Sequence, residues 1–266
     1  MKQQRVIAVV SIGTLVGLLG AVPGSAGPEK IAFPAGYGGH VLYTTLDRHD
    51  VKQYRELYAT PEAVQAAKAG KPIPSGSVLT LVMYKARADA SGAPVKDARG
   101  RFVKGDLIGF TVMEKRTGWG TEYAADLRNG EWEYAAFGAA GALNEKANHT
   151  RCFQCHKPYE TQDFVISMAS LAGTFPTGAV ARRTGPSDVT IAGFAFEPKT
   201  LTVGPGQSVT WTNTDDSAHR ITLLKSRERS PLLLKGQSHS QVFAAPGVYE
   251  YVCGLHPAVR GTIEVK

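Results

Sequence analysis

Residues 152–156 read Cys-Phe-Gln-Cys-His, and residues 253–256 read Cys-Gly-Leu-His. Together these two runs contain all three cysteines of the 266-residue chain, so no thiol remains for a disulfide. The first run has the spacing that attaches haem covalently through two cysteines, with the following histidine under the iron. A zinc half-site is the alternative, but the chain has no second cysteine pair to complete a zinc tetrahedron. We therefore predict Cys152 and Cys155 as the haem attachment residues and His156 as the proximal iron ligand.

Residues 1–26 have the pattern of a secretory signal peptide. Lys2 and Arg5 precede an apolar run from Val6 to Val22, and Gly24-Ser25-Ala26 offers a small-residue cleavage site. An uncleaved membrane anchor is the alternative, although the apolar run is short for a bilayer span. Covalent haem attachment also requires an exported chain, so we expect the mature protein in a bacterial periplasm or on the outer face of the membrane.

The formal net charge of +7 would fall to about +5 on removal of Lys2 and Arg5 with this segment. No lysine- or arginine-rich run is interleaved with aromatic residues, so we expect no nucleic-acid partner. The surplus charge suits weak docking to an acidic soluble redox partner. A second copy of the chain, forming a homodimer, is a further candidate partner.

Two domains are expected, at residues 27–171 and 188–266, joined by a Gly-, Pro- and Thr-rich linker at 172–187. In the first domain, Thr60-Pro61-Glu62 begins a helix that continues to Ala69, and a second helix is expected over 144–151. Strand-like runs cover 78–86, 107–115 and 131–137. The predicted fold of this domain is α+β, with a mostly antiparallel sheet and helices beside it.

The second domain consists of short strand-like segments separated by turns such as Gly204-Pro205-Gly206 and Ala245-Pro246-Gly247. This spacing predicts an all-β Greek-key sandwich. The expected strands are residues 189–194, 201–203, 208–213, 219–223, 238–243, 247–252 and 261–265.

Several motifs over residues 33–168 resemble the cytochrome P-460 family. Around the haem run they are Phe-Pro at 33–34, Ile-Pro-Ser-Gly-Ser-Val at 73–78, Val-Met-Tyr-Lys-Ala at 82–86, Val-Met-Glu-Lys-Arg at 112–116, Gly-Trp-Gly at 118–120, Gly-Glu-Trp-Glu-Tyr at 130–134, Lys-Pro at 157–158 and Asp-Phe-Val at 163–165. Because several motifs occur in the same order, the resemblance is more specific than the haem run alone.

The resemblance implies a five-coordinate c-type haem with an open iron site. In the hydroxylamine-oxidising members a lysine is also joined covalently to the porphyrin, and Lys85 is our candidate for it, with Lys115 as the alternative. A carboxylate near the open site would serve as a general base, and Glu114 is the candidate by position. The ordinary alternatives are an exposed strand-end lysine and a solvated strand glutamate.

Candidate copper ligands are His219, Cys253 and His256, because two imidazoles and a thiolate form the trigonal set that copper prefers. Residues 189–266 resemble the cupredoxins of the plastocyanin and amicyanin type, with Phe-Glu-Pro at 196–198, Val-Thr-Trp-Thr-Asn at 209–213 and Gly-Val-Tyr-Glu-Tyr at 247–251. The resemblance implies an axial methionine where this chain has Val259. A three-coordinate site favouring Cu(I), or weakened copper affinity, follows from that departure.

Two functions remain open from the sequence. The first is a periplasmic haem oxidoreductase that acts on hydroxylamine or a related small nitrogen compound and passes electrons to its own copper domain. The second is a non-enzymatic protein that binds nitric oxide or carries electrons.

Overall fold

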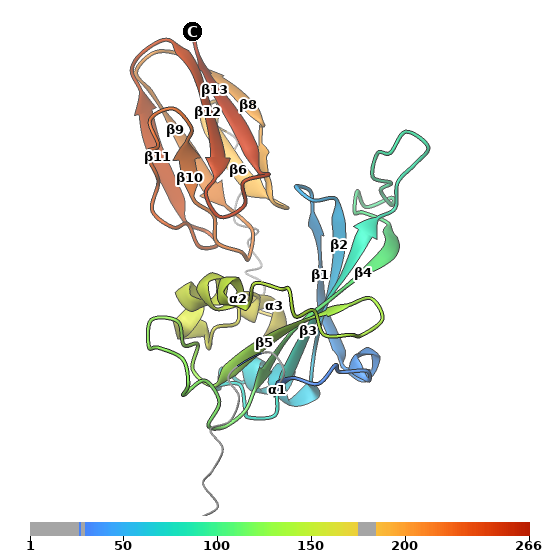
Figure 1. Cartoon of the computed structure of the whole chain (residues 1–266). Helices are drawn as coiled ribbons and strands as arrows, with labels where there is room; N and C mark the ends of the chain where they lie inside the picture. Colours follow the sequence, from blue (N-terminus) through green and yellow to red (C-terminus); the bar gives the residue numbers. More distant parts are fainter. Residues whose placement is uncertain (1–26, 28–29, 175–184) are drawn as a thin grey trace, which may run out of the picture.

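The computed structural model describes residues 27, 30–174 and 185–266 (Figure 1). The predicted signal peptide lies outside the described residues, as does most of the predicted linker. Among the helices in the described part of the chain, none is both long and apolar enough to cross a membrane.

A five-stranded sheet forms the centre of the N-terminal domain, and its strands follow one another in chain order with every neighbouring pair antiparallel. The predicted antiparallel α+β fold is therefore confirmed. The strands are β1 (Val41–Arg48), β2 (Gln53–Ala59), β3 (Val78–Ala86), β4 (Lys104–Lys115) and β5 (Trp132–Gly138). β3 has the predicted bounds, whereas β1 and β2 were not predicted.

β1 and β2 escaped prediction because they carry charged residues on a partly buried surface. Asp47 in β1 and Glu56 in β2 are both buried. Arg101 donates to the Asp47 carboxylate, and Lys104 donates to the Glu56 carboxylate. A buried carboxylate is tolerated when a cation from elsewhere in the chain pairs with it, and no local pattern reveals that partner.

The two faces of the sheet pack differently because side chains alternate along a strand. One face carries Leu79, Met113 and Trp132, and it packs against the helical segments. These segments are α1 (Pro61–Lys68), α2 (His149–His156) and α3 (Met168–Leu171), and the 3-10 helix η3 (Lys157–Gln162) directly follows α2. The opposite face carries Val82 and Val112 in a separate cluster.

The helix that contains the haem run starts later than expected. The prediction of a helix over 144–151 was wrong for residues 144–148, because α2 begins only at His149. The Asn148 side chain accepts a hydrogen bond from the Arg151 amide and so caps the N-terminal end of α2. The preceding residues form turns instead.

The C-terminal domain is a sandwich of two four-stranded sheets, with strand orders β10-β12-β13-β8 and β11-β9-β6-β7. Two of its pairings, β6 with β9 and β8 with β13, are parallel. Trp211, Tyr251 and Ile263 fill the core between the sheets. The strands are β6 (Asp188–Ala192), β7 (Ala195–Glu197), β8 (Thr200–Val203), β9 (Gln207–Asn213), β10 (Ile221–Leu223), β11 (Ser238–Phe243), β12 (Gly247–Cys253) and β13 (Arg260–Val265). The predicted all-β sandwich is confirmed.

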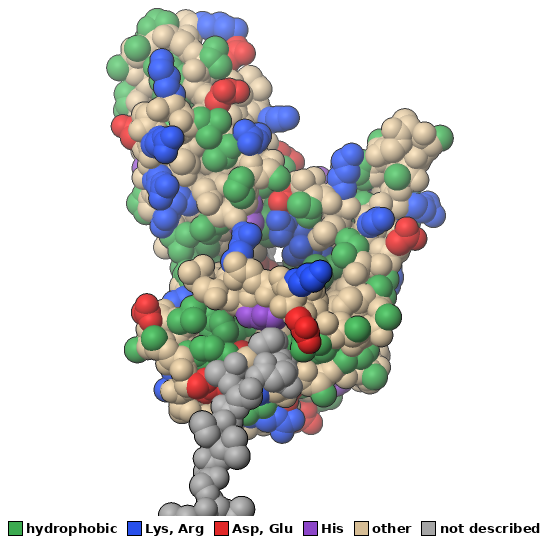
Figure 2. Space-filling view, in the orientation of Figure 1, with side chains coloured by type: hydrophobic (Ala, Val, Ile, Leu, Met, Phe, Trp, Pro, Cys, Tyr) green, Lys and Arg blue, Asp and Glu red, His purple; other side chains and the backbone are tan. Residues whose placement is uncertain are grey.

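One end of the sandwich lies next to α2, α3 and the turn between β1 and β2 (Figure 1). Leu46 of β1 packs against the core of the sandwich, and the His49 amide donates to the Gly193 carbonyl at 3.0 Å. Lys and Arg side chains are scattered among other types on the visible face (Figure 2), as the dispersed charge in the sequence predicts.

Candidate functional site

Cys152 and Cys155 lie three residues apart on α2, so their side chains project from the same side of the helix. Both thiols are free; Cys152 is half-buried and Cys155 is exposed. His156 ends the helix and packs against Tyr134, with 4.9 Å between the ring centroids. The attachment residues and the proximal ligand predicted from the sequence therefore lie together at the C-terminal end of α2.

The His156 ring is oriented by a hydrogen bond between Nδ1 and the Phe164 carbonyl, at 2.7 Å. A ligating histidine commonly donates its second ring nitrogen in this way, which fixes the tautomer and leaves the other nitrogen for the metal. Burial lowers the pKa of His156 to about 4, against the opposing effect of that hydrogen bond. The imidazole is therefore neutral near pH 7 and suited to bind haem iron through Nε2.

The Phe164 carbonyl is itself held in place by a partly buried polar cluster around Asp163. Both Asp163 and Phe164 have left-handed backbone conformations, with φ of 50° and 60°. Lys115 Nζ donates to the Asp163 carboxylate at 2.8 and 2.9 Å. The Ile73 amide and Trp132 Nε1 also donate to it, at 2.9 and 3.2 Å. This cluster fixes the strained turn that presents the carbonyl to His156.

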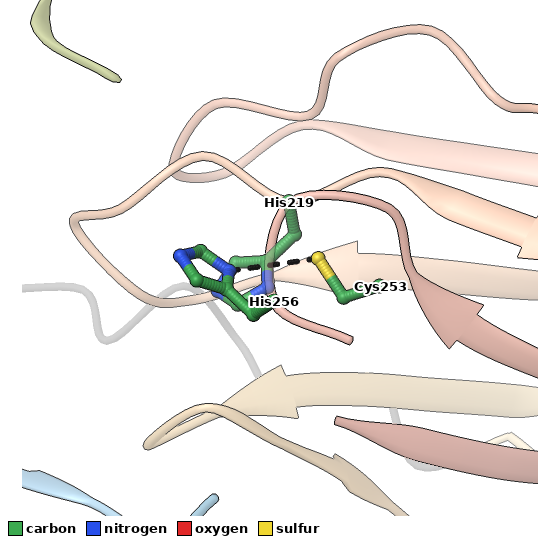
Figure 3. Close-up of side chains that lie close together, drawn as sticks. All are labelled: His219, Cys253 and His256. Carbon is green, nitrogen blue, oxygen red and sulfur yellow. Dashed lines mark hydrogen bonds between the residues drawn. The ribbon is translucent and has the colours of Figure 1, made fainter. Parts of the chain in front are cut away.

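A second site lies in the C-terminal domain, where the side chains of His219, Cys253 and His256 point toward one another (Figure 3). Their ligand atoms all lie within 4.8 Å of one another. His219 and Cys253 are fully buried, and Cys253 Sγ is 3.6 Å from His256 Nδ1. β12 supplies the cysteine, and the turn after it supplies His256.

His219 is also held by a carboxylate, since Asp215 Oδ2 lies 3.0 Å from its Nε2. Its buried Nδ1 has no hydrogen-bond partner among the described residues. A buried nitrogen without a partner costs free energy unless something binds it. Nδ1 is therefore the nitrogen that remains for a metal, and the residues present fit a thiolate-bound copper.

Val259 occupies the position beside this triad and is buried, with its carbonyl accepting from the Cys253 amide at 2.9 Å. The chain has no methionine after Met168. No thioether from this domain can therefore act as an axial ligand, and the soft donor set is limited to the thiolate and two imidazoles.

The cytochrome P-460 family model matches residues 34–167, which is half of the chain. The chain belongs to the cytochrome P-460 family. A model of the cupredoxin-like domain matches residues 164–265, including all three members of the copper triad.

Amicyanins are among the relatives of the cupredoxin domain. Amicyanin-alpha of Methylorubrum extorquens is 29% identical over 114 residues, covering 39% of this chain and 96% of the relative. Amicyanin of Paracoccus denitrificans is 29% identical over 137 residues, covering 50% of this chain and 88% of the relative. Among solved structures, a purple cupredoxin from Nitrosopumilus maritimus is 29% identical over 30% of this chain and 99% of its own, with a TM-score of 0.29.

The cytochrome P-460 domain implies c-type haem, and the cupredoxin domain implies copper. The protein is thus a redox protein of the oxidoreductase type. When bound, the iron and the copper each supply a centre that changes oxidation state by one electron.

Three further residues were predicted for the haem site: Lys85, Lys115 and Glu114. Each has a different environment in the structure. Lys85 is exposed and, by strand alternation from Leu79, lies on the sheet face that carries α2. It makes no ion pair with a described residue, whereas Lys115 is engaged with Asp163. Glu114 is buried, pairs with Arg116, and lies by alternation from Val112 on the face away from α2. The structure does not bring Glu114 to the haem run.

Three residues near the two sites were not singled out from the sequence: Tyr159, Asp215 and Asp216. Asp215 precedes His219 by four residues, and a carboxylate this close to a candidate ligand histidine is a usable signal. Tyr159 and Asp216 have no such signal, because they contact each other from different domains.

We expect copper binding by His219, Cys253 and His256 to depend on pH. Burial lowers the pKa of His219, but the Asp215 carboxylate and the Cys253 sulfur outweigh it, and the pKa is about 9. Burial raises the pKa of Cys253, but the two histidines outweigh it, and the pKa is about 5. Between these values the copper-free site therefore holds a thiolate and a protonated His219.

Because copper needs both groups deprotonated, we expect its uptake at pH 7 to release about one proton, from His219. The apparent affinity should rise about tenfold per pH unit between about pH 5 and pH 9 and level off above. Titration calorimetry of the copper-depleted protein in two buffers of different protonation enthalpy measures the release. Heats that do not depend on the buffer would contradict this charge assignment.

Proposed function

We propose that this protein is a periplasmic haem oxidoreductase that oxidises hydroxylamine or a related small nitrogen compound. The electrons released at the haem pass to the protein's own copper domain, and a soluble redox partner collects them there. Removing several electrons from a small molecule requires an acceptor, and tethering places one at high effective concentration. Membership of the cytochrome P-460 family supports the haem chemistry.

The observation that carries this proposal is the position of the two sites on one shared interface. Arg48, in β1 of the haem domain, stacks at 3.8 Å over Phe194 of the cupredoxin domain. Phe194 in turn contacts His219 and His256, with centroid separations of 5.3 and 4.9 Å. The charge of Arg48 also acts on the Cys155 thiol. One side chain therefore lies near both sites.

Lys85 supports the enzymatic form of the proposal, because it is exposed on the sheet face that carries α2 and makes no ion pair with a described residue. The placement of Glu114 favours the second candidate function, a protein that binds nitric oxide or carries electrons. A haem site without this carboxylate has lost the general base expected to accept protons from the substrate.

Anaerobic addition of hydroxylamine to the oxidised, fully loaded protein distinguishes the two functions. We expect the copper absorption to bleach and turnover to continue while a soluble electron acceptor is present. We also expect a proteolytic digest to contain a Lys85 peptide linked to haem. In Lys85→Arg the linked peptide and the accompanying red-shifted haem absorption should both be lost.

Lys52→Arg is the matched control, because Lys52 is an exposed lysine in the neighbouring β1–β2 turn. It should keep the linked peptide and the turnover. A haem spectrum that shifts on ligand addition while the copper stays oxidised, together with no linked peptide, would establish the binding protein instead.

A further inference from the structure

The interface between the two domains contains two side-chain hydrogen bonds that meet at one residue, Asp216. Tyr159 of η3 donates its hydroxyl to the Asp216 carbonyl oxygen at 3.1 Å. Ser170 of α3 donates its hydroxyl to the Asp216 carboxylate at 3.0 Å. Asp216 lies in the loop between β9 and β10, three residues before the copper ligand His219. The haem domain thus directly contacts the loop that leads to His219.

On the haem side, Tyr159 follows the proximal ligand His156 by three residues and is fully buried. Burial, with a smaller contribution from Cys155, raises the pKa of Tyr159 well above its usual value. The phenol therefore stays neutral and can donate its hydrogen bond to the Asp216 carbonyl oxygen throughout the physiological pH range.

On the copper side, Asp215 connects the loop to the metal ligand. Its Oδ2 lies 3.0 Å from His219 Nε2, and its carboxylate also accepts from the Gly193 and Phe194 amides at 2.6 and 2.9 Å. Lys235 holds the Asp216 carboxylate at 2.7 Å. These bonds order the loop between β9 and β10. The Asp216 carbonyl that accepts from Tyr159 and the Asp215 carboxylate beside His219 therefore both have defined positions.

We propose that electrons pass from the haem domain to the copper through Tyr159, the Asp216 carbonyl, the Asp215 carboxylate and His219. This inference rests on the proposed function only in assuming that the haem supplies the electrons. Between the His156 backbone and the His219 ring, the route consists of covalent bonds and two hydrogen bonds.

Each transfer moves one electron, which oxidises a ferrous haem to ferric and reduces a cupric centre to cuprous. No proton has to move, since Tyr159 remains neutral and its hydroxyl keeps its hydrogen bond to the Asp216 carbonyl oxygen. Electrons tunnel faster through bonded atoms than across the same length of non-bonded contact. The contact from Arg48 through Phe194 to His256 contains two non-bonded steps, of 3.8 and 4.9 Å, and is the weaker route.

The test compares two variants that each remove one hydrogen bond to Asp216. Tyr159→Phe removes a bond on the route, and Ser170→Ala removes a bond to the same residue that lies off the route. In the haem- and copper-loaded protein, a laser flash reduces the haem, and the bleaching of the copper absorption reports intramolecular transfer. We expect severalfold slower transfer in Tyr159→Phe and the wild-type rate in Ser170→Ala.

Copper and haem spectra and thermal unfolding of both variants establish that they fold and load normally. Equal slowing in the two variants would show that Asp216 only holds the domains together, and unchanged rates in both would place the route elsewhere. Either result overturns the inference. Because no substrate is used, a failure to oxidise hydroxylamine leaves this measurement unaffected.

Discussion

Replacing Cys253 with serine should remove the copper chemistry of this protein while leaving its haem intact. Cys253 is fully buried, and serine is close to it in size, so the sandwich should still fold. Its hydroxyl, however, is neither a soft donor nor ionised near pH 7, whereas the pKa of the Cys253 thiol is about 5. The variant therefore loses the only thiolate of the triad.

We expect the copper affinity of Cys253→Ser to fall by more than about 100-fold, because the loss of even an outer partner of a metal ligand costs about 10- to 100-fold. The visible thiolate-to-copper absorption should disappear. Elemental analysis and the absorption spectrum after reconstitution measure both effects. His239→Gln is the control, since His239 lies in β11, outside the triad. Retained copper and colour in Cys253→Ser would exclude the triad as the copper site.

Replacing Asp163 with alanine should give a large loss of stability in the cytochrome P-460 domain. The Asp163 carboxylate accepts from Lys115, the Ile73 amide and Trp132. The Lys115 side chain is only 12% exposed, so the variant leaves a largely buried ammonium without its anion. Breaking a buried pair in this way costs about 3 kcal/mol or more.

The same change should loosen the proximal histidine, because Asp163 anchors the turn whose Phe164 carbonyl binds His156 Nδ1. We expect a free energy of unfolding lower by about 3 kcal/mol and a changed iron–histidine vibration in the haem-loaded protein. Asp126→Ala, at an exposed position in the same domain, should be within about 0.5 kcal/mol of wild type. A stability of Asp163→Ala equal to that control would refute the anchoring role.

The secondary structure followed from the sequence where the signals were local. β3 matches its predicted bounds at both ends, because residues 78–86 are a long apolar run of strand-forming residues. The beginning of α2 was misplaced, since several residues between 144 and 148 suit either a helix or a turn. β1 was not predicted because its buried Asp47 is stabilised by Arg101, more than fifty residues away.

The same difference between local and long-range signals applies to the candidate sites. The spacing within 152–156 and within 253–256 was sufficient to identify the haem attachment residues and two copper ligands as candidates. Lys85, Lys115 and Glu114 could not be distinguished by spacing, because strand alternation assigns a face only once the register and the position of α2 are known. The structure then places Lys85 and Glu114 on opposite faces and engages Lys115 with Asp163.

The sequence by itself determined the chemistry available to this protein: two thiols and an imidazole for haem, a thiolate and two imidazoles for copper, and the two folds that carry them. These signals are short-range, because a motif or a strand is specified by residues close together in the chain. Only the tertiary structure decided which ring nitrogens of His156 and His219 remain for a metal, and that Tyr159 contacts the loop of the copper ligand. Such contacts join residues far apart in the chain, and packing alone brings them together.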